Sequence, residues 1–190
     1  MSKPVLIAYG TRYGCTEEVS ERIGTILKEK GLEVMRVNLV KTNKKEWPPV
    51  QDFSGIIVGS SIKGNRWTKE PQQFLKDHKK ELKKLDGPLG IFICSLTAVT
   101  DYQKAFNLYI EKITKKIGVE PTLSEAFGGV LDFSETSHLG TFERTMMLAA
   151  LKNIEKDMDV SLIPNGKNDL RNWEKIDSFA RKFASLLDST

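Results

Sequence analysis

The strongest constraint on the fold is a short apolar run followed at once by a glycine-containing turn and a helical pattern. Residues 5–9 are apolar without interruption, and residues 10–16 form the turn. Apolar residues then recur at helical spacing over residues 19–27, until Gly31 ends the helix. This beginning predicts the first half of a β–α–β unit.

The same alternation continues along the chain. Residues 55–59 are apolar on both faces, as a central strand of a parallel sheet must be. Further strands are expected at residues 32–37, 89–94 and 126–131, and helices at residues 68–85, 102–117 and 169–187. Strands that alternate with helices predict an α/β fold, namely a doubly wound, five-stranded parallel sheet covered by helices on both sides.

Length and composition fit a single domain over residues 1–190. The chain is 39% hydrophobic and 28% charged, which is ordinary for a soluble globular protein and too apolar for a disordered one. The connection at approximately residues 132–168, between the fifth strand and the last helix, is far longer than the usual loop of about 2–6 residues. We expect this insertion to carry function.

Charge and cysteine content exclude several classes of protein. The net charge of +4 is a mild excess, well short of that of a dedicated nucleic-acid binder, so no nucleic acid partner is expected. With only Cys15 and Cys94 as cysteines and only His78 and His138 as histidines, neither a disulfide framework nor a metal site is expected. The amino-terminal apolar run lacks the length of a secretory signal, and we expect a cytoplasmic protein.

The turn after the first strand carries the candidate phosphate site. Ligands of open parallel sheets bind beyond the carboxyl ends of the strands, and here hydroxyl and backbone N–H groups come directly before a helix, where anions bind. The loop is neither a Walker loop nor the three-glycine dinucleotide motif. Taken singly, Thr16 fits a plain helix N-cap and Gly14 a tight turn, but together with Thr11 they predict phosphate binding. The residues assigned to this site are Thr11, Arg12, Tyr13, Gly14, Cys15 and Thr16.

Two further loops, after the third and fourth strands, are expected to hold a flat ring. Small polar residues and backbone groups can hydrogen-bond the edge of such a ring, while apolar side chains cover its faces. Trp67 either stacks on the ring or packs at the start of the helix that follows. The residues assigned to these loops are Ser61, Ile62, Lys63, Gly64, Trp67, Ser95, Leu96, Thr97 and Ala98. No catalytic acid or base and no metal ligand is nominated.

The turn after the first strand, residues 11–16, resembles the phosphate loop of flavodoxins. That family's pattern is approximately Ser/Thr-x-Thr-Gly-x-Thr, and residues 11–16 read Thr-Arg-Tyr-Gly-Cys-Thr, with Tyr13 and Cys15 as departures. The resemblance covers nearly the whole chain. It implies a flavodoxin-like sheet with strand order 2-1-3-4-5 and flavin mononucleotide (FMN) as the cofactor.

Within this superfamily the chain is similar to the flavodoxin-type, menaquinone-dependent protoporphyrinogen oxidases. The likeness lies in the phosphate loop, the insertion, residues 59–62 (Gly-Ser-Ser-Ile) and residues 172–174 (Asn-Trp-Glu). It implies oxidation of a reduced tetrapyrrole or a similar substrate, with a quinone as acceptor and the flavin supplying the chemistry. The alternatives are a flavodoxin that passes electrons between partner proteins without a substrate of its own, and an interaction module without flavin.

Cations near the expected flavin favour an enzyme over a low-potential carrier. Arg12, Lys63 and Arg66 lie in or beside the loops. Flavodoxins that shuttle single low-potential electrons resemble one another in being acidic around the flavin, which disfavours its reduced, anionic form. A cation about 8 Å from the ring contributes roughly 2 kcal/mol at an effective dielectric constant of about 20. The fully reduced flavin is then easier to reach, which favours two-electron chemistry.

The insertion and the cysteines each leave alternatives open. Residues 142–154 form an apolar helical face that is far shorter than the about 20 residues of a membrane span. This face either packs on the chain's own sheet or on a second subunit of a homodimer, or it lies over the flavin edge or on a membrane surface and admits a quinone or porphyrin. Cys15 and Cys94 are either a redox dithiol or two ordinary reduced cysteines.

Overall fold

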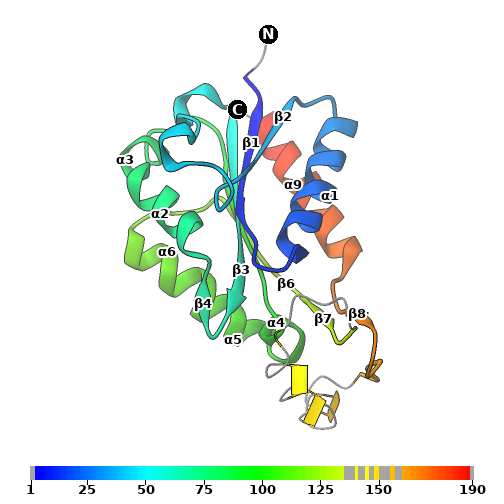
Figure 1. Cartoon of the computed structure of the whole chain (residues 1–190). Coiled ribbons are helices and arrows are strands. Elements are labelled where there is room, and N and C mark those ends of the chain that lie inside the picture. The colour runs from blue at the N-terminus through cyan, green and yellow to red at the C-terminus, as the bar shows by residue number, and fades with distance from the viewer. Residues whose placement is uncertain are drawn as a thin grey trace.

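A row of parallel strands forms the centre of the molecule (Figure 1). The computed structural model describes residues 3–134, 140, 144–145, 148–149, 155–156 and 160–188. The strands of the row are, in spatial order, β2 (Val34–Asn38), β1 (Val5–Gly10), β3 (Gly55–Lys63), β5 (Leu89–Cys94) and β6 (Leu123–Phe127). Each neighbouring pair in the row runs parallel. Counted along the chain, this is the order 2-1-3-4-5, so the predicted fold is confirmed.

Helices cover both faces of this sheet. Helices α1 (Cys15–Glu29) and α9 (Trp173–Asp188) pack together on one face, and α2 (Lys69–Asp77), α3 (Lys79–Leu82) and α6 (Lys112–Ile117) lie on the other (Figure 1). A separate cluster of buried apolar side chains fills the space under each layer. In the described part of the chain, no helix is long and apolar enough to cross a membrane.

A hairpin extends the third parallel strand beyond the predicted residues 55–59. Strand β4 (Arg66–Trp67) pairs antiparallel with the end of β3. Gly64 and Asn65 connect them with φ angles of 55° and 58°. Two consecutive left-handed residues are what a two-residue hairpin turn requires, and Gly and Asn are the residues that adopt this conformation most readily. The hairpin therefore follows from local sequence, although its pattern is too short to stand out.

The predicted helices are interrupted in places. The one expected at residues 68–85 is divided into α2 and α3 at His78. The one expected at residues 102–117 contains a wider turn, η3, with i→i+5 hydrogen bonding. The remaining short elements are η1 (Lys44–Glu46), η2 (Val50–Asp52), α4 (Thr97–Thr100), α5 (Tyr102–Phe106) and η3 (Asn107–Glu111).

The prediction of one fifth strand at residues 126–131 is wrong in its bounds. The sheet strand β6 ends at Phe127, and β7 (Val130–Asp132) belongs to a separate antiparallel pair with β8 (Lys167–Asp169). The chain turns between them at Gly128, where a Cβ atom would overlap the carbonyl oxygen of Leu170. Only a glycine permits this approach, so the backbone leaves the sheet here.

The insertion starts and ends in this antiparallel pair. Because residues 167–169 are a strand, the last helix begins at Trp173 rather than at residue 169. Of the apolar helical face expected at residues 142–154, residues 144–145 and 148–149 are described and are helical. The rest of that face lies outside the described residues.

The contact between Gly59 and Phe92 gives a test of the packing between β3 and β5. A Cβ atom at Gly59 would overlap the ring of Phe92, which is fully buried. Gly59→Ala should therefore lower the free energy of unfolding by about 1–3 kcal/mol, measured by urea denaturation. In a Phe92→Leu background the same substitution should cost less, because the smaller side chain leaves room. Additive losses in the double variant would contradict this packing.

Candidate functional site

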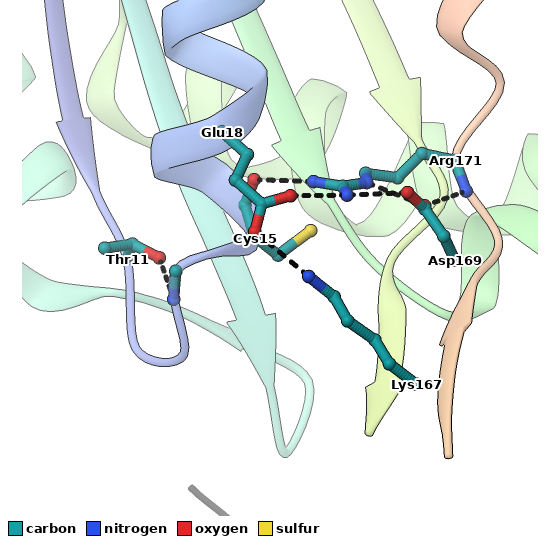
Figure 2. A network of polar contacts seen from close by, with 7 residues as sticks. Thr11, Cys15, Glu18, Lys167, Asp169 and Arg171 are labelled. Atoms are coloured by element: carbon teal, nitrogen blue, oxygen red, sulfur yellow. Dashed lines mark hydrogen bonds and ion pairs between the residues drawn. The ribbon is translucent and has the colours of Figure 1, made fainter. Parts of the chain in front are cut away.

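The loop between β1 and α1 is closed by its own residues and presents free N–H groups. The backbone N–H of Gly14 donates to Oγ1 of Thr11 at 3.0 Å (Figure 2). Gly14 has a φ of 86°, and apart from its chain neighbours no atom of the described residues lies within 4 Å of the place where a Cβ would stand. Among the residues that the structure describes, no side chain caps the start of α1. Its first-turn N–H groups, which no helix can satisfy internally, are therefore available to a ligand.

Thr16 supplies an unsatisfied donor in the same turn. Its side chain is fully buried, and its hydroxyl has no well-formed hydrogen bond in the described part of the protein, although it lies close enough to the Cys94 thiol, a weak partner, to act on the pKa of that thiol. A buried hydroxyl without a partner is costly, and an anion at the helix terminus is the kind of group that removes the cost. The residues of this loop therefore fit a bound phosphate.

Two carboxylates in the first turn of α1 would oppose an anion, but both are compensated. Glu17 accepts a hydrogen bond from Tyr9 at 3.0 Å and pairs with Lys41 at 3.7 Å. Glu18 pairs with Arg171 at 2.6 Å and with Lys167 at 3.2 Å. Burial alone would raise the pKa of Glu18, but the hydrogen bonds from the two cations outweigh it and the pKa is lowered. Glu18 therefore stays ionised while its charge is balanced.

Arg171 is the residue of this region that the sequence did not single out. Its side chain is only 2% exposed and donates two hydrogen bonds to the carboxylate of Asp169, at 2.7 and 2.6 Å. It also donates to the carbonyl oxygen of Cys15 at 3.4 Å. Burial works against its charge, but the hydrogen bonds with Asp169 and Glu18 raise its pKa overall. The available signal was the spacing of Asp169 and Arg171, two residues apart and directly after the insertion.

Arg12 and Lys63 join the phosphate loop to the β3–β4 hairpin. The guanidinium of Arg12 donates to the carbonyl oxygens of Ser61 at 3.2 Å and Trp67 at 2.9 Å. The ammonium of Lys63 contacts the hydroxyl of Tyr13 and lies 4.8 Å from the centre of its ring. The structure thus brings these predicted site residues together, and the nearness of their cations to a flavin stays a prediction.

The stacking role expected for Trp67 does not fit the structure. The indole is only 3% exposed, and its N–H donates to the carbonyl oxygen of Tyr109 at 2.6 Å. The hydroxyl of Tyr109 in turn donates to Asn65 at 2.6 Å, so the tyrosine holds both the second turn residue and strand β4 of the hairpin. An indole buried in this way has no open face for a flavin. The alternative, packing before the helix that begins at residue 69, describes it better.

The loop after β5 lies at the same edge of the sheet. The Oγ atom of Ser95 accepts a hydrogen bond from the N–H of Thr97 at 3.1 Å, which shapes the turn into α4. Leu96 packs against the small apolar cluster at the base of the insertion. Ile62 and Ala98 are partly buried on the α2 side of the sheet. Contact of these residues and of Gly64 with a flavin ring remains a prediction.

The two cysteines lie close together under the phosphate loop, and both are free thiols. Cys15 packs against the buried cluster that contains Cys94. A hydrogen bond from Cys94 lowers the pKa of the Cys15 thiol, and the charge of Arg171 acts in the same direction. Burial raises the pKa of Cys94. The pair is therefore asymmetric, with Cys15 the more readily ionised thiol.

The fold and this loop together define a class of protein. A parallel sheet whose strand order reverses beside β1, with an uncapped helix and a threonine-rich turn at that point, defines the α/β proteins that bind a nucleotide phosphate. A family model described as "Flavodoxin domain" matches residues 6–161. The chain belongs to this family, and its cofactor is FMN.

Known proteins resemble the chain over most of its length. Protoporphyrinogen IX dehydrogenase (quinone) from Escherichia coli is 23% identical over 191 residues, which cover 96% of both chains. Among solved structures, a flavodoxin from the domain Archaea has a TM-score of 0.52 and 14% identity, and the match covers 97% of this chain and 99% of that one. The rubredoxin oxygen:oxidoreductase of Desulfovibrio gigas has a TM-score of 0.57 and 12% identity, and this chain spans 37% of its length.

The buried hydroxyl of Thr16 should distinguish FMN from riboflavin. Thr16→Val removes the donor without changing the shape of the side chain, so FMN should bind roughly ten- to a hundredfold more weakly while riboflavin binding stays nearly the same. Because the hydroxyl has no well-formed hydrogen bond to any described residue, the free protein should become more stable by up to about 1 kcal/mol. Fluorescence titration and urea denaturation measure these effects. Thr25→Val, on the exposed side of the same helix, is the control and should change neither affinity.

The asymmetry of the cysteines predicts selective alkylation. Iodoacetamide should modify Cys15 before Cys94, with a pH midpoint below that of an ordinary thiol near 8.5. Cys94→Ala should move this midpoint upward, because it removes the hydrogen bond that lowers the pKa of Cys15. Mass spectrometry of the alkylated peptides measures both rates. Equal rates at the two cysteines would contradict the assignment.

Proposed function

We propose that this FMN-binding protein is an oxidoreductase that oxidises a reduced tetrapyrrole of the protoporphyrinogen type and passes the electrons to a quinone. Support comes from the E. coli relative, which is named for this activity and matches the chain almost from end to end. When bound, FMN accepts and releases the electrons at the edge of its ring. The protein's own residues bind the phosphate, hold the loops and set the electrostatic field.

The observation that carries the proposal is the cationic edge of the site. Arg12 is hydrogen-bonded to backbone carbonyls and to the hydroxyl of Ser61. No carboxylate in the described part of the chain pairs with it, so its charge is not cancelled. A positive charge beside a group that becomes negative on reduction favours the reduced form. That is the bias expected of an enzyme that takes two electrons from a substrate.

The partners belong to the same proposal. Quinones and tetrapyrroles are flat and largely apolar, so they partition into membranes. A protein that binds them would reach them by brief contact with a membrane surface. A cytoplasmic protein that touches the inner face of the membrane, alone or as a homodimer, would fit these substrates.

A second candidate function is that of an electron carrier without a substrate of its own. It is favoured by the match to a flavodoxin over nearly the full length of both chains. Such a carrier would exchange electrons with a reductase and a partner protein.

Turnover separates the two functions. FMN-loaded protein mixed with protoporphyrinogen IX and menadione without oxygen should form fluorescent porphyrin at a rate that depends on the quinone. Thr16→Val at low FMN should be slow and should recover when FMN is added in excess. The carrier function would be favoured if porphyrin formed no faster than without protein and if a flavodoxin reductase rapidly reduced the FMN-loaded protein.

The cationic edge is tested by the flavin potential in the same preparation. Arg12→Met should lower the two-electron midpoint potential by tens of millivolts, on the order of what one partly solvated charge contributes. Arg181→Met, in the middle of α9 with an exposed side chain, is the control and should leave the potential unchanged. An unchanged potential in Arg12→Met would remove the electrostatic support for the enzyme.

A further inference from the structure

We propose that Arg171 is a positioning residue for the cofactor phosphate, because it cancels the charge of Glu18 and holds the first turn of α1 in place. The inference rests on the phosphate site assigned above to the start of α1. Arg171 lies in the segment that joins β8 to α9, far along the chain from the phosphate loop. It would thus make phosphate binding depend on a residue that follows the insertion.

The contacts of Arg171 converge on the first turn of α1 (Figure 2). Its guanidinium donates to the carboxylate of Glu18 at 2.6 Å and to the carbonyl oxygen of Cys15 at 3.4 Å. Asp169 accepts from Nε and from Nη2 of the same guanidinium, and Nη2 is also the atom that donates to Glu18. A planar, five-donor group held on several sides has one orientation, which a lysine could not reproduce. The first turn is therefore fixed from the side opposite to the phosphate loop's own hydrogen bonds.

The charges around this turn are balanced. Two cations, Arg171 and Lys167, face two carboxylates, Glu18 and Asp169. Removal of Arg171 would leave one excess negative charge, and one of the carboxylates belongs to the turn whose N–H groups meet the phosphate. A phosphate carries close to two negative charges at neutral pH and would be repelled.

Of the two cations that pair with Glu18, Arg171 is the more buried and therefore has the stronger effect on its charge. Its side chain is 2% exposed, whereas that of Lys167 is 51% exposed. The ring of Trp173 covers the guanidinium, with its centre 4.4 Å away. Charge that is shielded from water and salt acts more strongly on its neighbours than exposed charge does. Arg171, rather than Lys167, should therefore set the affinity for the phosphate.

The test compares FMN with riboflavin, which lacks the phosphate. The readout is the ratio of their dissociation constants, obtained by fluorescence titration for each variant. Arg171→Met should reduce the preference for FMN about tenfold, while Glu18→Gln should increase it, because a negative charge next to the phosphate is lost. The double variant Glu18→Gln/Arg171→Met should return close to the parent ratio.

A role as a structural clamp alone would give a different pattern. If Arg171 only fixed the helix, Glu18→Gln would loosen the same turn and would lower the preference for FMN, as Arg171→Met does. The matched control is Arg22→Met, which removes a two-point contact between α1 and Asp177 of α9, at 2.7 and 2.6 Å. It should lower the stability of the fold and leave the ratio unchanged.

The outcomes separate the inference from the site on which it rests. A parent protein that binds FMN and riboflavin equally would overturn the phosphate site itself. A parent that prefers FMN, with a ratio that falls in Glu18→Gln or does not recover in the double variant, would overturn the role of Arg171 alone. If Arg171→Met does not fold, the single Glu18→Gln variant still decides, since the two explanations predict opposite signs for it.

Discussion

The unsatisfied N–H groups at the start of α1 are the constraint on which the site depends. A helix cannot bond its own first N–H groups, and in the described part of this chain no side chain does so. The residues around these N–H groups leave room for a ligand. Gly14 forms the turn, Thr11 closes the loop, and the buried hydroxyl of Thr16 has no well-formed hydrogen bond to the residues that the structure describes. Parallel pairing of β1 with both β2 and β3 puts the gap where the strand order reverses. The topology thus places unbonded N–H groups at the edge of the sheet, and the phosphate of the cofactor would accept hydrogen bonds from them.

Local patterns predicted most of the fold and part of the site. Uninterrupted apolar runs such as residues 55–59 identify buried parallel strands because both faces must be covered. The phosphate loop was also visible, since a turn before a helix carries its chemistry in consecutive residues. The role of Trp67 stayed open between two alternatives because an exposed ring and a buried ring look the same in sequence, and its contact with Tyr109, 42 residues further on, favours packing.

Arg171 was missed for a related reason. Its partners Cys15 and Glu18 are more than 150 residues away in the chain, so no local pattern joins them. The bounds of the fifth strand were missed because the strand ends before Gly128, which packs against the backbone of Leu170. No local sequence pattern marks this contact. In each case the physical cause is a contact between distant segments. Hydrophobic periodicity predicts which face of a helix or strand a residue occupies. It does not predict which distant residue packs against that face.

The antiparallel pair of β7 and β8 has a consequence for how such chains diversify. Asp132 and Lys167 are paired neighbours, so the two ends of the segment that connects these strands lie side by side. The entropy of closing such a loop grows only with the logarithm of its length, by about 0.6 kcal/mol for each doubling. Segments of very different size and chemistry could therefore replace one another there while the sheet and the phosphate loop stay as they are. The β7–β8 pair therefore separates this segment from the phosphate loop, so that changes in the one would leave the backbone of the other in place.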